Sequence, residues 1–215
     1  FASAYTQSST STLLNPTGTI TFNGPGTLTI ASGGSFKMTA DTANVDTDNQ
    51  GNLYIESGTS TINSTSFNNP GVLTIRSTNS GSNAGLVMAN GFTNAGTITL
   101  DNASGSPRTQ TLTVSEGTLL NSGVIETTNT GSGSSTNNLD IDTLSNIGTV
   151  NVNESMNLTF ATSATNESSG NINIAETKTL DINGGTFNNN GAITLLGNSS
   201  STTLDLAGLT SLSNN

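Results

Sequence analysis

The chain of 215 residues contains no cysteine, no histidine and no tryptophan. Without cysteine it can form neither disulfide bonds nor thiolate metal sites. Without histidine it lacks the commonest general base and every Ser-His-Asp or Cys-His catalytic arrangement. We therefore expect no catalytic residue and no enzymatic activity in this chain.

Positive charge is also scarce. Four lysine and arginine residues stand against fourteen aspartate and glutamate residues, which gives a formal net charge of -10. Nucleic-acid binding needs clustered cations that displace counterions from phosphate, and an anionic membrane surface repels an acidic protein. No apolar run approaches the ~18 residues of a membrane-spanning helix. We expect neither a nucleic-acid partner nor membrane insertion.

Glycine, serine, threonine and asparagine together make up more than half of the residues. Such a composition alone is typical of disorder. A repeated pattern argues against disorder: Asn-x-Gly is followed by apolar residues two and four positions after the glycine. It is clearest at residues 92–100 and recurs at 187–195, 144–152 and 67–75. The nine marker glycines are Gly18, Gly26, Gly51, Gly71, Gly96, Gly123, Gly148, Gly170 and Gly191.

The positions after these glycines alternate between apolar and polar residues. The position two after each glycine is always aliphatic, and the position four after it is apolar in every repeat except at Thr127. This alternation predicts short strands with one buried face. The first set is Ile20, Leu28, Leu53, Leu73, Ile98, Ile125, Val150, Ile172 and Ile193, and the second is Phe22, Ile30, Ile55, Ile75, Leu100, Thr127, Val152, Ile174 and Leu195.

Further apolar pairs upstream of many glycines, such as Leu112 and Val114, indicate a second strand in each repeat. A third apolar position lies four residues before the glycine, as at Phe92. One such repeat cannot bury its own apolar face, but stacked parallel repeats can. The sequence therefore predicts an all-β fold, a right-handed parallel β-helix (β-solenoid) of about nine coils of 20–27 residues. The right-handed winding is inferred from the coil length and from the general preference of parallel strands for right-handed crossover connections.

The predicted solenoid covers residues 13–215, and residues 1–12 form an N-terminal extension or cap. The C-terminal residues match the approach to a further marker glycine, with Leu212 four positions before it and Asn214 two before it. We therefore expect that the chain is an excised part of a longer shaft.

An asparagine stands two residues before six of the glycines, at Asn49, Asn69, Asn94, Asn121, Asn146 and Asn189. Asparagine and glycine both tolerate positive φ, so this pair predicts a tight corner, and stacked amides can bond along the column. The polar insertions between strands are expected to project as loops and to carry any binding function. They are residues 39–50, 78–83, 102–109, 129–137, 161–169 and 197–202.

The sequences Ala-Gly-Thr-Ile-Thr-Leu at 95–100 and Asn-Gly-Ala-Ile-Thr-Leu at 190–195 show the style of the repeat. In this style the chain resembles bacterial filamentous-haemagglutinin-like adhesins and autotransporter passenger domains, over residues 12–215. The resemblance implies a secreted β-helical shaft at the cell surface that acts in adhesion or biofilm contacts. It also implies that the partner is a glycan or protein on a host or neighbouring cell.

Two groups of acidic residues are candidates for chemistry. Asp41, Asp46 and Asp48 lie in the densest acidic stretch and are candidate Ca²⁺ ligands, since hard cations prefer several oxygens. The stretch lacks the EF-hand pattern, so a solvated polar loop is the preferred interpretation. Asp140, Asp181 and Asp205 are expected in one outward column, where paired carboxylates are a requirement of glycoside hydrolysis.

The preferred function is a secreted or cell-surface adhesive shaft. Two alternatives stay open: a self-assembling extracellular fibre subunit whose coils stack end to end, and a polysaccharide-processing enzyme. The enzyme is disfavoured because no tryptophan and only two tyrosines are present to form a sugar-stacking platform.

Overall fold

The computed structural model describes residues 5–7, 12–13, 19–78, 82–197 and 201–214. These residues form parallel strands and turns and no helix, as the period-2 pattern predicts. One sheet has nine strands, with neighbours in the sheet about one coil apart in the sequence. They are β2 (Thr12–Leu13), β4 (Ser35–Met38), β6 (Asn52–Glu56), β9 (Val72–Ser77), β12 (Thr97–Asn102), β14 (Val124–Thr128), β16 (Thr149–Val152), β18 (Asn171–Ile174) and β20 (Ala192–Leu195).

A second sheet has twelve strands and covers the rest of each coil. Most of its strands are long and change register where they bend, whereas the coils at residues 58–69 and 84–94 each use two short strands instead. The strands are β1 (Tyr5–Gln7), β3 (Thr21–Ile30), β5 (Thr42–Asn49), β7 (Gly58–Ile62), β8 (Phe67–Asn69), β10 (Ala84–Met88), β11 (Phe92–Asn94), β13 (Arg108–Asn121), β15 (Ser135–Asn146), β17 (Met156–Asn166), β19 (Thr179–Asn189) and β21 (Thr203–Asn214).

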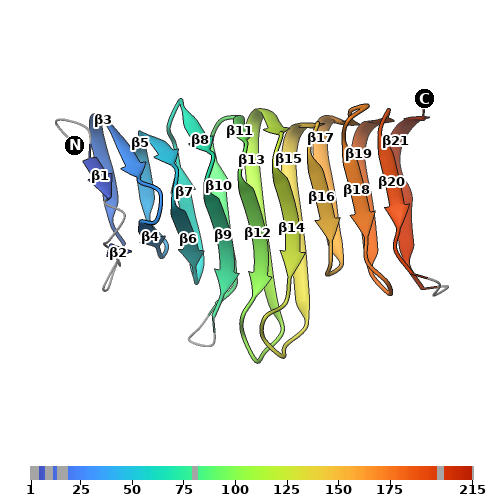
Figure 1. Ribbon diagram of the computed structural model, residues 1–215, viewed down its shortest axis with the longest axis horizontal. Coiled ribbons are helices and arrows are strands. Elements are labelled where there is room, and N and C mark those ends of the chain that lie inside the picture. Colours follow the sequence, from blue (N-terminus) through green and yellow to red (C-terminus); the bar gives the residue numbers. More distant parts are fainter. Residues whose placement is uncertain (1–4, 8–11, 14–18, 79–81, 198–200, 215) are drawn as a thin grey trace.

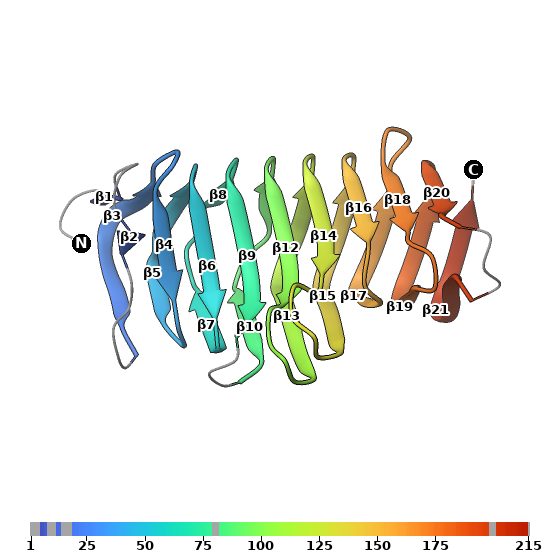
Figure 2. The ribbon, with the colours of Figure 1, turned by 60° about the horizontal axis from the view of Figure 1, so that its bottom comes forward.

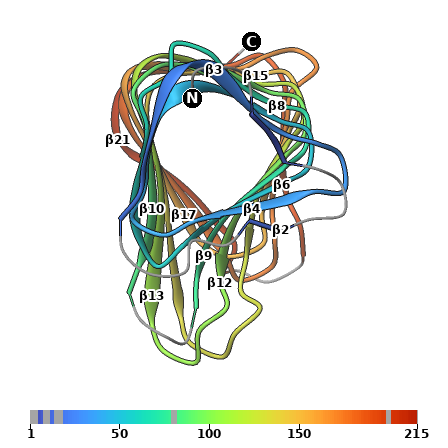
Figure 3. The same ribbon diagram turned by 90° about the vertical axis from the view of Figure 1, so that its left-hand side faces the viewer.

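The two sheets wind into a parallel β-solenoid of about eight turns. Successive coils follow one another along the long axis, from β1 at one end to β21 at the other (Figures 1 and 2). Seen along that axis, the coils superimpose as one closed outline (Figure 3). Part of the expected N-terminal extension joins this array, because β1 pairs with β3.

The core consists of columns of apolar side chains that stack from coil to coil. The position two after the glycine is buried at Leu53, Leu73, Ile98, Ile125, Val150 and Ile172, which confirms the predicted register. The pattern fails near the ends. Ile20 is 36% exposed and Leu195 is 47% exposed. Ile20 precedes a strand of the other sheet, and β20 is the last described strand of the nine-stranded sheet.

The assignment of Gly26 as a marker was wrong. Gly18 lies outside the described residues, and Gly26 lies on β3, in the twelve-stranded sheet. The first described marker is Gly34, whose carbonyl accepts a hydrogen bond from Asn52 N as the carbonyl of Gly51 does from Val72 N. It was missed because Phe36 and Met38 were taken for an upstream strand, although they align with Leu53 and Ile55.

The marker glycines from Gly51 to Gly191 are required by close packing between coils, and their φ angles are not positive. A Cβ atom at Gly96 would overlap the carbonyl oxygen of Gly71, and one at Gly123 would overlap that of Gly96. The predicted positive φ was therefore wrong at this corner. Among the non-glycine residues that the structure describes, positive φ occurs at Ala40, Ser57 and Thr177.

The asparagines before the glycines form a continuous ladder, which is buried except at its last member, Asn214. Each Nδ2 donates to the Oδ1 of the next coil over 2.7–2.9 Å, which confirms the predicted bonding along the column. Most of these Nδ2 groups also donate to a backbone carbonyl of the next coil. Its members are Asn49, Asn69, Asn94, Asn121, Asn146, Asn166, Asn189 and Asn214.

The ladder begins where a hydrophobic residue takes the asparagine position. Ile30 pairs with Asn49 in the register, so the Oδ1 of Asn49 is buried without a hydrogen-bond partner among the described residues. Every later Oδ1 in the ladder accepts from the preceding coil.

Two of the expected loops are strands. Residues 42–49 form β5, and β17 continues to residue 166. In both segments alternate side chains are buried, but the inward positions include the polar residues Thr47, Asn49 and Asn166, so the apolar alternation is interrupted there.

Candidate functional site

The solenoid widens at one corner, where each coil passes from the nine-stranded sheet to the twelve-stranded sheet. The segments that follow β12 and β14 extend away from the closed outline there (Figure 3). They correspond to residues 103–107 and 129–134, within two of the predicted insertions. We call these two segments the corner loops. The adjacent predicted loop at 78–83 lies only partly within the described residues, as does the one at 197–202.

The corner loops stack on each other as the strands do. Gly131 N donates to the carbonyl of Asn102 over 2.8 Å, and Gly133 N donates to that of Ser104 over 3.0 Å. A Cβ atom at Gly131 would overlap the carbonyl oxygen of Ser104, so glycine is needed for this approach. The loops therefore continue the parallel stacking of the coils.

Asn102 holds both corner loops. Its side chain is fully buried, and its Nδ2 donates to the carbonyls of Ser106, Gly133 and Ser134. Its Oδ1 accepts from Ser104 N over 2.9 Å. One side chain thus fixes the backbone of two coils, and the outward residues of the loops keep a defined position.

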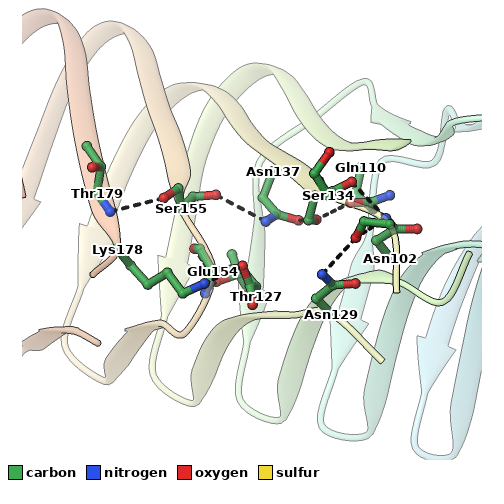
Figure 4. A network of polar contacts seen from close by, with 12 residues as sticks. Asn102, Gln110, Thr127, Asn129, Ser134, Asn137, Glu154, Ser155, Lys178 and Thr179 are labelled. Carbon is green, nitrogen blue, oxygen red and sulfur yellow. Dashed lines mark hydrogen bonds and ion pairs between the residues drawn. The ribbon is translucent and has the colours of Figure 1, made fainter. Parts of the chain in front are cut away.

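A network of polar contacts continues this corner along the axis (Figure 4). Gln110 Nε2 donates to Ser77 Oγ, and Ser135 Oγ donates to Gln110 Oε1, both over 2.8 Å. Further along, Asn137 Nδ2 donates to the carbonyl of Ser155. The side chains of Gln110 and Asn137 are almost completely buried, so these contacts replace water for groups that would be costly to leave unpaired.

The few cations take part mainly in ion pairs outside the core. Lys37 and Arg76 both pair with Glu56, and the guanidinium of Arg76 also lies 5.1 Å from the ring centre of Tyr54. Lys178 pairs with Glu154 over 2.8 Å. These contacts bind neighbouring coils together. Burial alone would raise the pKa of Glu56, but the hydrogen bonds and charges of Arg76 and Lys37 outweigh it and hold the pKa below its usual range.

The three candidate Ca²⁺ ligands do not converge. Asp41 is buried and accepts hydrogen bonds from Ile20 N and Thr39 N. Asp46 and Asp48 occupy outward positions of β5 and accept from residues of the next coil. Within the described part of the chain, no three histidine, cysteine, aspartate or glutamate side chains gather in a metal-binding group.

The expected column of three carboxylates is only partly formed. Asp181 and Asp205 are paired in register, as predicted. Asp140 lies in a different column, next to Thr113 and Thr159, because Asn138 is the residue that aligns with Asp181 through Asn157. The prediction was wrong because Leu180 aligns with Met156 and not with Leu158.

Asp140 and Asp142 line a shallow hollow of about 270 Å³ at the bend of the twelve-stranded sheet. Partial burial raises the pKa of Asp140. Hydrogen bonds from Thr162 Oγ1 and Gly117 N lower the pKa of Asp142. The two carboxyl groups therefore differ in proton affinity. The aromatic residue that lines this hollow, Phe160, is only 1% exposed, so its ring offers no open surface on which a sugar could stack.

Comparisons with protein-family models, with curated proteins and with solved structures gave no significant match. The resemblance expected from the repeat is therefore established only as a fold, a parallel β-solenoid. In the described ranges no helix is long and apolar enough to cross a membrane.

Proposed function

We propose that the chain is a structural and adhesive shaft, exported from the cell, whose corner loops contact a glycan or protein on another cell. The observation that supports this proposal is the ordered stacking of the corner loops on a rigid solenoid. Outward residues of the loops, such as Ser106, Ser132 and Ser134, are exposed, while Asn102 beneath them is fully buried.

Rigid support of exposed loops favours recognition because less conformational freedom is lost on binding. Among the described segments, the corner loops extend furthest from the closed outline in Figure 3. Repeat proteins commonly place binding residues on loops that emerge on one side of the array. The resemblance to surface adhesins agrees with this assignment.

The test is a binding screen against glycans, extracellular proteins and whole cells. A variant with Ser106→Lys, Ser132→Lys and Ser134→Lys changes the corner loops without touching Asn102. The matched control carries Ser122→Lys, Ser168→Lys and Ser169→Lys, three exposed residues at the Asn-x-Gly corner. We expect the first variant to lose binding and the control to retain it. Equal binding by both variants would exclude the corner loops as the contact surface.

A second candidate is a fibre subunit whose coils stack between molecules. One observation favours it: Leu195 and Leu212 are 47% and 51% exposed at the coil that contains β20 and β21. A hollow of about 530 Å³ opens there, between Phe187, Leu204 and Leu206. A coil of a second copy, with the same apolar spacing, fits this surface.

Sedimentation and electron microscopy of the purified protein test the fibre. Leu212→Lys places a charge on the exposed side of β21 and should abolish concentration-dependent growth. Ile147→Lys is the control, since Ile147 is also exposed, at 40%, but lies at a lateral corner. Protein that stays monomeric at high concentration, or filaments that survive Leu212→Lys, would contradict the second candidate.

A further inference from the structure

Asparagine followed directly by glycine is a dipeptide prone to spontaneous deamidation. Glycine has no Cβ atom, so its backbone nitrogen can approach the preceding side chain without hindrance. The chain contains four such pairs, which are Asn23–Gly24, Asn90–Gly91, Asn183–Gly184 and Asn190–Gly191. The dipeptide is the same in each case, so any difference in reactivity must come from the surroundings of each pair in the solenoid.

In three of the pairs the glycine is packed against a neighbouring coil. A Cβ atom would overlap backbone atoms of that coil at Gly91, Gly184 and Gly191. In the first of these pairs, Asn90 Nδ2 also donates to the carbonyl of Ser64 over 3.0 Å. The peptide nitrogen of these glycines can therefore turn toward the asparagine side chain only if neighbouring coils separate locally.

The pair in β3 has different surroundings. Asn23 and Gly24 are both exposed, and they lie where the register between β3 and β5 shifts, between Asn23 and Thr27. Gly24 has no paired residue in β5, and its φ of 145° belongs to the region that favours glycine. The segment borders a surface hollow of about 230 Å³. Movement of this peptide group therefore disturbs less packing, and water can reach it.

A short outward ladder of asparagines ends at Asn23. Asn63 Nδ2 donates to Asn44 Oδ1 over 2.9 Å, and Asn44 Nδ2 donates to Asn23 Oδ1 over 2.7 Å. The bond from Asn44 polarises the side-chain carbonyl of Asn23 and stabilises the negative charge that its oxygen gains during nucleophilic attack. The Nδ2 of Asn23 donates to no residue in the described part of the chain, so this nitrogen is free to leave.

We propose that Asn23–Gly24 is a site of spontaneous deamidation, with Asn44 as the activating donor. Gly24 N forms a bond to Asn23 Cγ, and its proton leaves with Nδ2 as ammonia, so that a succinimide ring remains. Water then opens the ring to aspartate or isoaspartate. Both products carry a new negative charge, and isoaspartate adds a methylene group to the backbone of β3. This proposal does not rest on the adhesive function.

Ageing the folded protein at mildly alkaline pH, followed by peptide mapping with mass spectrometry, tests the site. The mapping separates the isoaspartyl peptides of the four pairs. Protein unfolded in guanidinium chloride is the reference, because packing no longer distinguishes the pairs there. Asn44→Ala removes the donor. Asn63→Ala is the matched control, since it leaves the bond from Asn44 to Asn23 in place.

In the folded protein we expect Asn23 to convert at least about tenfold faster than the other three asparagines, which must first lose contacts with a neighbouring coil. In guanidinium chloride the four rates should become similar. Asn44→Ala should slow conversion at Asn23 severalfold, and Asn63→Ala should leave the rate unchanged. The proposal is overturned if Asn23 converts no faster than the other pairs in the folded protein, or if Asn44→Ala fails to slow it.

Discussion

Two neighbouring residues of β12 show how much burial differs along one strand. Ile98 is fully buried, whereas the side chain of Thr99 faces outward and donates to Glu126 Oε1 over 3.2 Å. Replacing a buried isoleucine by alanine removes apolar contacts and leaves a cavity.

We expect Ile98→Ala to lower the free energy of unfolding by about 2–5 kcal/mol. Thr99→Ala should lower it by no more than about 0.5 kcal/mol, because it removes one partly exposed hydrogen bond. Denaturant unfolding of both variants measures the difference. Similar losses at the two positions would show that the register of the strand is wrong.

The pKa values of Asp140 and Asp142, which line the same hollow, are shifted in opposite directions. The two residues should therefore contribute to stability in opposite ways as the pH changes. Asp140 has a raised pKa in the folded state, so it binds its proton more tightly when folded. The stability that it contributes is present below the ordinary pKa of aspartate and is lost as the pH rises through the folded value. Asp140→Asn should therefore raise the melting temperature at pH 7 and have little effect near pH 3.

Asp142 has a lowered pKa, so its contribution is present above the ordinary pKa and is lost as the pH falls through the folded value. Asp142→Asn should lower the melting temperature at pH 7. Thermal unfolding of both variants between pH 3 and pH 7 separates the two signs. A rise in both variants at pH 7 would indicate general relief of charge repulsion instead.

At the scale of single elements, the asparagine ladder depends on every member. Asn94 donates to Asn121 and to the carbonyl of Val124, and it accepts from Asn69. Asn94→Ala leaves several buried groups unpaired, each at a cost of about 1–3 kcal/mol, so we expect a loss of at least about 2 kcal/mol in unfolding free energy. Asn173→Ala, in the partly exposed pair with Asn151, is the control and should cost under about 1 kcal/mol.

In the turn between β18 and β19, a threonine adopts a left-handed backbone conformation that favours glycine. Thr177 has a φ of 65° in a turn closed by a hydrogen bond from Lys178 N to the carbonyl of Ala175. The turn closed by Gly34 N and Ala31 O has Gly33 at the same place, with a φ of 79°. A β-branched residue is strained in this region.

Thr177→Gly should therefore raise the free energy of unfolding by about 1 kcal/mol, the difference between relieved strain and the greater freedom of glycine when unfolded. Gly33→Thr, the reciprocal change, should destabilise. Chemical denaturation of the two variants provides the measurement, and destabilisation by Thr177→Gly would show that the strain is absent.

The strands and their buried faces follow from the sequence wherever apolar alternation is strong, as at residues 97–100 and 149–152. The pattern misled where the inward positions are polar or small. Asn166 was missed because Glu167, Ser168 and Ser169 separate it from Gly170, and β5 was missed because its inward residues include Thr47 and Asn49. The right-handed coil stays a prediction from coil length.

The candidate site was less predictable than the fold. Composition identified the corner loops as insertions, but the role of Asn102 depends on contacts with a loop about thirty residues away. The contacts of Gln110 with Ser77 and Ser135 likewise join residues that lie 33 and 25 positions apart. Such sites are properties of the stacking, and a linear pattern does not encode them directly.

For the whole molecule, stability is distributed along a one-dimensional array, since each coil contacts mainly its neighbours. Central strands such as β15 have a partner on both sides, whereas β21 has one within the described residues. We expect amide hydrogen exchange to be slowest in β13, β15 and β17 and clearly faster in β21. Uniform protection from β3 to β21 would show that the array unfolds as a single unit.

The asparagine ladder also gives the rod a direction. All seven links run from Nδ2 to the Oδ1 of the following coil, so the carboxamide dipoles of eight residues point the same way along the axis. Reversing one amide would place two NH2 groups opposite each other on one side and two carbonyl oxygens opposite each other on the other side. All members of the column therefore share one orientation. The rod is therefore electrically polar along its axis from Asn49 to Asn214, much as aligned peptide units make an α-helix polar.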